Sequence, residues 1–223
     1  VGAAGIAMFV VMAMTQARGV GAMSLIAQAV GRKDPDDANL VFNQAMALGA
    51  MLAFATLAGG YLATSWYMNL VGADAATVAA GSAYLYWFLP GLALQYVNMV
   101  MMSGLRGTGV VQPTMVVQIA TVLLNAALAP VLIAGIGTDK PMGVAGAGLA
   151  STISVAAGTL MLAGYMLRLE KYVHFRMPLW KPRAAVWARM INIGAPAGGE
   201  FLLMFVFMAV IYWVIRDFGA AAQ

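Results

Sequence analysis

The sequence predicts an all-α integral membrane protein with six transmembrane helices. Hydrophobic residues make up 63% of the 223 residues and charged residues only 9%, far below the roughly 25% that soluble domains carry. Six long apolar runs follow one another along the chain, each near or above the ~20 residues that cross a bilayer as a helix. They lie near residues 4–30, 39–66, 78–103, 113–136, 143–167 and 190–215.

Polar loops separate the six runs and set their ends. The runs are apolar nearly all round and rich in Ala, Gly and Met, which is typical of helices packed in lipid. The first loop ends in acidic residues, which favour the start of the next helix. The fifth loop is the longest and alternates basic with aromatic residues, so we expect part of it to lie in the membrane interface. The loops comprise residues 31–37, 67–77, 104–112, 137–141 and 168–189.

Basic residues gather on one side of the predicted membrane. Loops 31–37, 104–112 and 168–189 hold nine of the twelve Lys and Arg residues, whereas the other two loops and the C-terminal end hold two. The positive-inside rule therefore predicts that these three loops are cytoplasmic. Because topology explains the net charge of +4, we expect the lipid bilayer as a partner and no nucleic acid.

Glu200 is the strongest candidate for a functional residue. If the sixth run enters the membrane near Ile191, its carboxyl lies about 13 Å deep, near the middle of the bilayer core. A carboxyl group at this depth favours its neutral form, which suits proton uptake and release. Glu200 could also ligate a cation, or act only as a structural hydrogen-bond donor. Pro196, one turn earlier, is interpreted as a helix hinge, although Gly194 and Gly198 could simply permit close helix packing.

Polar residues on the third and fourth runs form two faces. Gln95 and Asn98 share a face of the third run, and Gln118, Thr121 and Asn125 share a face of the fourth. These faces could line a substrate cavity. They could equally form hydrogen bonds between helices, each contributing roughly 0.6–2 kcal/mol.

Arg18 is the other charge inside an apolar run, and other chemistry finds little support. Arg18 either pairs with a carboxylate elsewhere or extends to the membrane surface. The chain has no cysteine and a single histidine, His174, so disulfides, thiolate chemistry and a His-rich metal site are not expected. No Ser/His/Asp or paired-carboxylate arrangement is present, so we predict no catalytic residue, no metal site and no enzyme.

Four segments, in order along the chain, resemble the multidrug and toxic compound extrusion (MATE) transporters. The first resembles the loop after the family's second helix, and the second its LRGxG…P turn between helices four and five. The third resembles the passage from helix five to helix six, and the fourth the start of helix seven. The segments are Gln28–Ala38, Leu105–Gly109 with Pro113–Met115, Asn125–Thr152, and Ile193–Pro196.

The resemblance implies a twelve-helix transporter with two six-helix lobes around a central cavity, which exports organic cations and drugs in exchange for protons or sodium. This chain would supply helices two to seven. Residues 1–189 would form most of the N-terminal lobe with a cytoplasmic linker, and residues 190–223 the first helix of the C-terminal lobe. Helix one and helices eight to twelve would come from the remainder of its own chain. The expected location is the bacterial inner membrane.

Two positions depart from the family pattern. Many proton-coupled members carry an Asp four residues after the helix-five Asn, where this chain has Ala129. Sodium-coupled members carry a helix-seven Glu about eight residues after the Pro, where this chain has Met204, and Glu200 lies one turn earlier. Residues four apart share a helix face. We therefore expect ion coupling at Glu200, with H⁺ or Na⁺ and no other cofactor, and place Met204 in the substrate cavity.

Two further functions remain as alternatives. A lipid-linked-oligosaccharide flippase of the same wider superfamily would need several cavity arginines for a pyrophosphate, and only Arg18 is available. A passive channel or a structural membrane protein would need no titrating carboxyl near the middle of the membrane. Cation-coupled antiport by alternating access is the leading prediction because ion binding at Glu200 could favour one facing state over the other.

Overall fold

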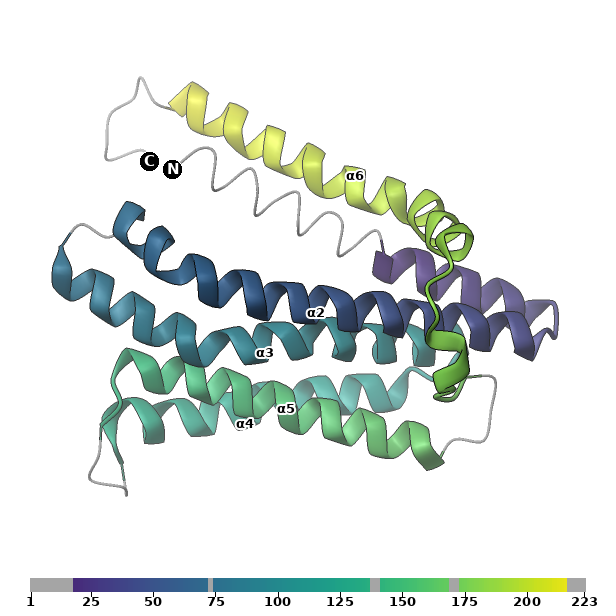
Figure 1. Cartoon of the computed structure of the whole chain (residues 1–223), viewed down its shortest axis with the longest axis horizontal. Helices are drawn as coiled ribbons and strands as arrows, with labels where there is room; N and C mark the ends of the chain where they lie inside the picture. The colour runs from purple at the N-terminus through teal and green to yellow at the C-terminus, as the bar shows by residue number, and fades with distance from the viewer. Residues whose placement is uncertain (1–17, 72–73, 137–140, 169–172, 216–223) are drawn as a thin grey trace.

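The computed structural model describes residues 18–71, 74–136, 141–168 and 173–215, and every regular element in these ranges is helical. Residues 18–31 form the first helical segment. The elements after it are α2 (Pro35–Val71), α3 (Ala75–Gly107), α4 (Gln112–Ala134), α5 (Val144–Arg168), the short 3₁₀ helix η1 (Met177–Trp180) and α6 (Ala184–Ile215) (Figure 1).

The helices agree with the predicted runs, and several extend a few residues into the predicted loops; α2 continues to Val71 and α3 to Gly107. Four of the described helices, α2 to α5, are long and apolar enough to cross a membrane. Helix α2 begins at Pro35, inside the predicted loop, because the Asp34 side chain caps it by accepting the Asp37 backbone N–H at 3.0 Å. Helix α6 begins at Ala184 rather than near residue 190, so part of the predicted loop is helical. Residues 4–17 of the first run lie outside the described residues.

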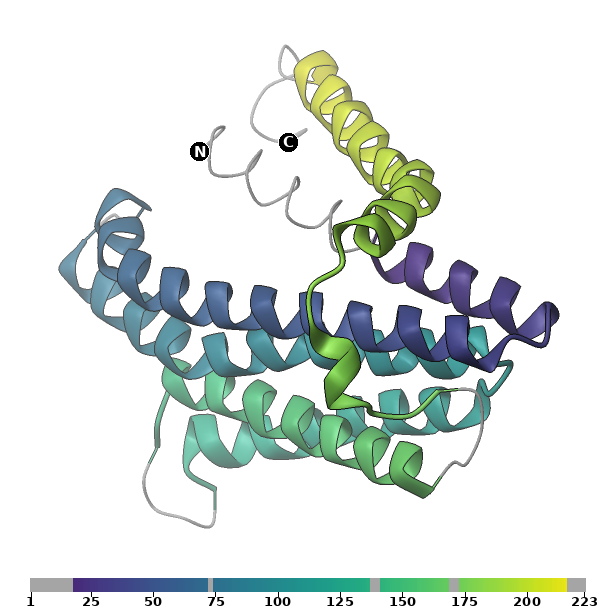
Figure 2. The same cartoon turned by 45° about the vertical axis from the view of Figure 1, so that its right-hand side comes forward.

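Helix α3 lies at the centre of the bundle. It packs along both α2 and α5, and α4 packs on the other side of α5. The segment 18–31 and α6 lie on the opposite side of α2 from α4 and α5, and α6 diverges from α2 along its length (Figure 2). Helix α6 accordingly has few contacts with α2.

Small residues allow α3 and α5 to approach closely. A Cβ atom on Gly148 of α5 would lie 2.6 Å from the Tyr84 carbonyl oxygen, and one on Gly91 of α3 would lie 2.7 Å from Thr152 Oγ1. The Thr152 hydroxyl uses this proximity: it accepts the Gly91 backbone N–H at 3.0 Å and donates to the Trp87 carbonyl oxygen. Small residues at helix contacts are the usual means by which membrane helices pack.

The largest buried side chains gather at one end of the bundle. This end also carries loops 31–37 and 104–112 and the segment 173–189, and we call it the basic end. Its core includes Ile26, Phe42, Met101, Leu105, Leu162, Met166 and Met190, each at most 1% exposed. The loops that are predicted to be cytoplasmic therefore lie at the end of the bundle where this core is packed.

Alanine at Gly148 should destabilise the bundle, whereas alanine at Gly164 on the same helix should not. The added methyl of Gly148→Ala would meet the Tyr84 carbonyl oxygen, and overpacking of this kind costs about 1–3 kcal/mol. Gly164 is exposed and has no described atom within 4 Å of an added Cβ, so alanine there gains up to about 1 kcal/mol in helix propensity. Thermal unfolding in detergent measures both. Equal midpoints would contradict the close approach of α3 and α5.

Candidate functional site

The structure places the predicted coupling residues on α6. Glu200 and Met204 lie one turn apart and both are exposed, Met204 to 61%. Pro196 is also exposed, and α6 continues as one α-helix through it. The described helices therefore leave this face of α6 uncovered. The roles of Glu200 in ion coupling and of Pro196 as a hinge stay predictions.

The polar residues predicted to line a cavity fall into two groups. Gln95 and Gln118 are exposed. Asn98 donates from Nδ2 to Thr159 Oγ1 at 3.3 Å, and Asn125 donates from Nδ2 to Ser151 Oγ at 3.2 Å. Both amides thus bond across to α5.

Gly158 is where the polar faces of α3 and α4 meet α5. A Cβ on Gly158 would lie 2.5 Å from Thr121 Oγ1 and 3.5 Å from Asn98 Nδ2. Thr121 donates to the Val117 carbonyl oxygen of its own helix at 2.8 Å. The structure brings Asn98 and Thr121 together beside Gly158. Such close contact between polar groups of different helices is typical of hydrogen bonds between helices. Their role in a substrate cavity stays a prediction.

Arg18 lies buried between helices and does not extend to the surface. Its side chain is 1% exposed, and its guanidinium carbon lies 5.4 Å from the centre of the Tyr96 ring on α3. Within the described part of the chain, none of its three guanidinium nitrogens has a hydrogen-bond partner. The aromatic face offers a cation–π contact, but a buried charge usually requires hydrogen-bond acceptors as well.

Three buried amides on α2 form a site that the sequence analysis missed. Asn39, Asn43 and Gln44 are at most 2% exposed, and they lie in the first turns of the second predicted run. They face residues 173–183, which cross α2 and which we call the strap. Their partners are mostly backbone groups of the strap. A pattern of side chains in the sequence therefore does not reveal which groups the amides bind. The available signal is the grouping of three amides within six residues of an otherwise apolar run.

Asn43 is the centre of this site. Its Oδ1 accepts the Arg176 backbone N–H at 2.8 Å and the Trp180 indole N–H at 3.1 Å, and its Nδ2 donates to the His174 carbonyl oxygen at 2.9 Å. Asn39 Oδ1 completes the pairing by accepting the His174 backbone N–H at 3.0 Å. The side chain of Asn43 therefore uses both its donor and its acceptor capacity on the strap.

Gln44 holds the other half of the strap. Its Nε2 donates to the carbonyl oxygens of Leu179 and Lys181, and its Oε1 accepts the Arg183 backbone N–H at 2.9 Å. The Trp187 indole N–H donates to the Gln44 backbone carbonyl oxygen at 3.2 Å. A buried hydrogen-bonding group left without its partner costs about 1–3 kcal/mol. These contacts therefore raise the free energy that is needed to detach the strap from α2.

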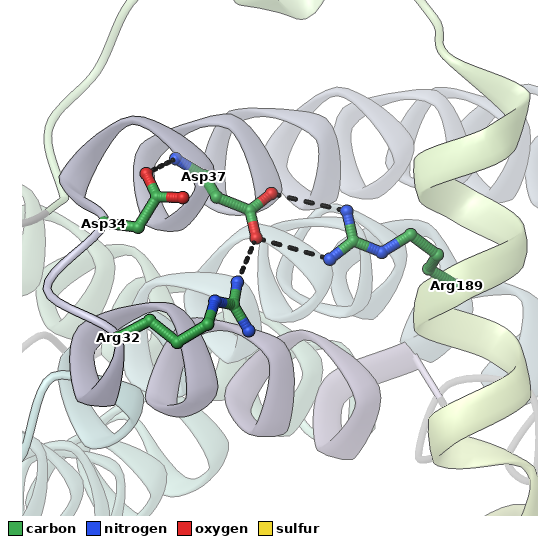
Figure 3. A network of polar contacts seen from close by, with 4 residues as sticks. All are labelled: Arg32, Asp34, Asp37 and Arg189. Atoms are coloured by element: carbon green, nitrogen blue, oxygen red, sulfur yellow. Dashed lines mark hydrogen bonds and ion pairs between the residues drawn. The ribbon is translucent and has the colours of Figure 1, made fainter.

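An ion-pair network joins the loop before α2 to the start of α6 (Figure 3). The Asp37 carboxylate accepts from Arg32 at 2.7 Å and from both terminal nitrogens of Arg189 at 3.3 Å. The arginines are about half exposed, and exposed ion pairs contribute at most about 1 kcal/mol. The network positions the first turns of α6 without strongly stabilising them.

An apolar groove of about 480 Å³ lies beside the strap. It is lined by Ala47, Ala50, Met51, Phe54, Trp180 and Pro182. None of the residues predicted to contact substrate is among them. The strap thus forms one wall of a groove whose other wall is α2.

Comparison with known proteins identifies the architecture. The MatE family model matches residues 2–131. A FAD transporter of Shewanella oneidensis is 24% identical over 92% of this chain and 47% of that protein. The multidrug export protein MepA of Staphylococcus saprophyticus is 25% identical over 95% of this chain and 45% of that protein.

The fold is also that of a solved transporter. An outward-facing multidrug resistance MATE family transporter of the MOP superfamily superposes with a TM-score of 0.80 at 24% identity, over 97% of this chain and 47% of that one. The chain therefore spans about half the length of the relatives that it matches.

Removing the Asn43 amide should destabilise the protein, whereas removing an exposed amide of the same helix should not. Asn43→Ala removes this buried amide and leaves the His174 carbonyl, the Arg176 backbone N–H and the Trp180 indole N–H without their partner, and a loss of about 1–3 kcal/mol is expected. Asn69→Ala is the matched control, because Asn69 is exposed and donates only to the Ser65 carbonyl oxygen one turn earlier. Thermal unfolding in detergent gives the comparison. An unchanged midpoint for Asn43→Ala would mean that the strap does not depend on this amide.

Proposed function

This chain belongs to the MatE family, and from that membership we propose that it supplies helices two to seven of a cation-coupled antiporter that exports organic cations and drugs by alternating access. The observation that carries the proposal is the match of the family model to residues 2–131. The shared fold supports it: the chain superposes over nearly its whole length on about half of a multidrug transporter.

The division into lobes follows from the same correspondence. Residues 1–189 would form most of the N-terminal lobe with its linker, and residues 190–223 the first helix of the C-terminal lobe. The packing of α2 to α5 into one bundle, with α6 diverging from it, supports this division. The remainder of the chain, helix one and helices eight to twelve, would complete the cavity.

The orientation is proposed from charge. Loops 31–37, 104–112 and 168–189, whose described parts include those that lie at the basic end, would face the cytoplasm, and the membrane would be the bacterial inner membrane. Nine of the twelve Lys and Arg residues lie in these segments. Helix α6 would then enter from the cytoplasm and carry Glu200 toward the middle of the bilayer.

Glu200 would couple the ion gradient to drug movement. On α6 it is exposed beside Met204 and so faces a region that the described helices leave open. A carboxyl in a cavity between the lobes could release a proton or bind sodium, and this event would have to favour one facing state to drive transport. Met204, Gln95 and Gln118 offer exposed groups to a substrate, and Asn98, Thr121 and Asn125 would stand behind them.

Neutralising Glu200 should abolish driven efflux without abolishing substrate binding. In proteoliposomes of the full-length protein, Glu200→Gln removes the titrating group, so efflux of the organic cation ethidium under an imposed proton or sodium gradient should fall at least tenfold. Asp36→Asn, which removes an exposed carboxylate at the basic end, should transport like the wild type. FAD is assayed beside ethidium because one relative is named an FAD transporter. Normal transport by Glu200→Gln would place coupling elsewhere.

Residues 1–223 alone should not transport. The proposed cavity lies between two lobes, and this chain spans about half the length of its relatives. Reconstituted without the remainder, the chain should move neither ethidium nor FAD against a gradient, while the full-length protein in parallel vesicles should do so. Uphill movement by the 223 residues alone would overturn the proposed division of the cavity.

A further inference from the structure

The strap is bound to α2 more firmly than a connection between two moving lobes requires. Seven hydrogen bonds join the side chains of Asn39, Asn43 and Gln44 to residues 174–183. Apolar contacts add to them, since Val173 is fully buried and the rings of Phe42 and Phe175 lie 5.6 Å apart. Val173 of the strap belongs to the bundle core, and Phe175 and Trp180 pack against that core.

The first turns of α6 belong to the same body. Val186 and Met190 are buried in the core cluster of the basic end, and the backbone of Met190 lies against Gly21 with no room for a side chain there. Trp187 bonds to the backbone of α2, and Arg189 pairs with Asp37. Beyond Met190, residues 191–193 are exposed, whereas Gly194 and Gly198, which continue the helix face of Val186 and Met190, are buried. Among the described residues of α6, Met190 is the last that belongs to this core cluster.

We propose that Asn39, Asn43 and Gln44 are positioning residues that keep the strap and residues 184–190 docked on α2 in both facing states, so that α6 moves relative to the bundle only beyond Met190. This proposal rests on the proposed function, because it assumes alternating access. Detaching the strap in each cycle would break all seven hydrogen bonds and uncover the three buried amides. Transport cycles work between states of similar free energy, so a step of that cost is avoided.

The three amides of α2 contribute more to the docking of the strap than the Asp37 ion pairs do. Asp37→Asn removes both ion pairs, but the two arginines are about half exposed, and exposed ion pairs contribute little to stability. Asp37→Asn should therefore leave the strap docked. Gln44→Met keeps the size of the side chain but removes its hydrogen bonds to Leu179, Lys181 and Arg183, so it should loosen the strap.

Distances between spin labels in the full-length protein test the proposal. The 223 residues contain no cysteine, so an introduced pair labels this region selectively. One pair joins Val122 on α4 to Lys181 in the strap, and a second joins Val122 to Leu203 on α6; all three residues are exposed. Distances are measured by electron paramagnetic resonance in lipid, at two pH values, with and without sodium and ethidium.

We expect the Val122–Leu203 distance to shift by several ångströms between conditions while the Val122–Lys181 distance changes by less than about 2 Å, the scale that separates rearrangement from rigid packing. A matching shift of both pairs would overturn the proposal, because the strap would then move with α6. No shift of either pair would contradict alternating access itself, and the proposal would fall with the proposed function.

The amide variant supplies a second readout. In Gln44→Met the Val122–Lys181 distance distribution should broaden at least twofold, and it should stay narrow in Asp37→Asn and in Gln28→Met, which alters an exposed glutamine of segment 18–31. An unchanged distribution in Gln44→Met would overturn the role given to this amide. If Gln44→Met does not fold, the wild-type distances alone still decide whether the strap stays docked.

Discussion

A polar group buried away from water must find a hydrogen-bond partner, and α2 buries three amides where the strap crosses it. Those amides can be satisfied only if residues 174–183 run along one path, because their partners are backbone groups at fixed intervals. The path of the strap in turn determines where α6 starts, beside Gln44 and Asp37. The placement of Glu200, sixteen residues after Ala184, is therefore set from the basic end.

The middle of the bundle is held together by a different means. Between α3 and α5 the chain relies on small residues and on hydroxyl and amide groups that bond from helix to helix, as Thr152 does with Gly91 and Trp87. Hydrophobic burial gives no preference for helix contacts inside lipid, where tails are as apolar as side chains. Close packing at glycines then decides which faces meet. This explains why α3, with neighbours on two sides, is central.

The helices could be predicted from the sequence, whereas the strap could not. Apolar runs of the length of a bilayer are visible residue by residue, and α3, α4 and α5 agree with the predicted runs to within a few residues. The strap depends on contacts between residues more than 130 positions apart, and its groups are main-chain atoms, which no residue pattern reveals. The early start of α6 has the same origin, because Val186 and Met190 are buried by helices distant in sequence.

The candidate site shows a similar division. Asn98, Thr121 and Asn125 share faces as the 3.6-residue period requires, but only the fold shows that Asn98 and Asn125 bond to α5. Glu200 could be singled out because a carboxylate stands alone in an apolar run, and the described helices leave it exposed on α6. Arg18 was expected to pair or to reach the surface, and the structure buries it against Tyr96.

The separation between α2 and the strap also has a consequence for biosynthesis. A ribosome completes Asn43 long before His174, and at ordinary elongation rates the interval is on the order of ten seconds. During that time the amides of α2 must remain hydrated, which their position in the first turns of the helix allows. Nascent α2 can therefore settle fully into the basic end only after α3, α4 and α5 have been made. The order of synthesis makes the strap the last of these elements to join the basic end.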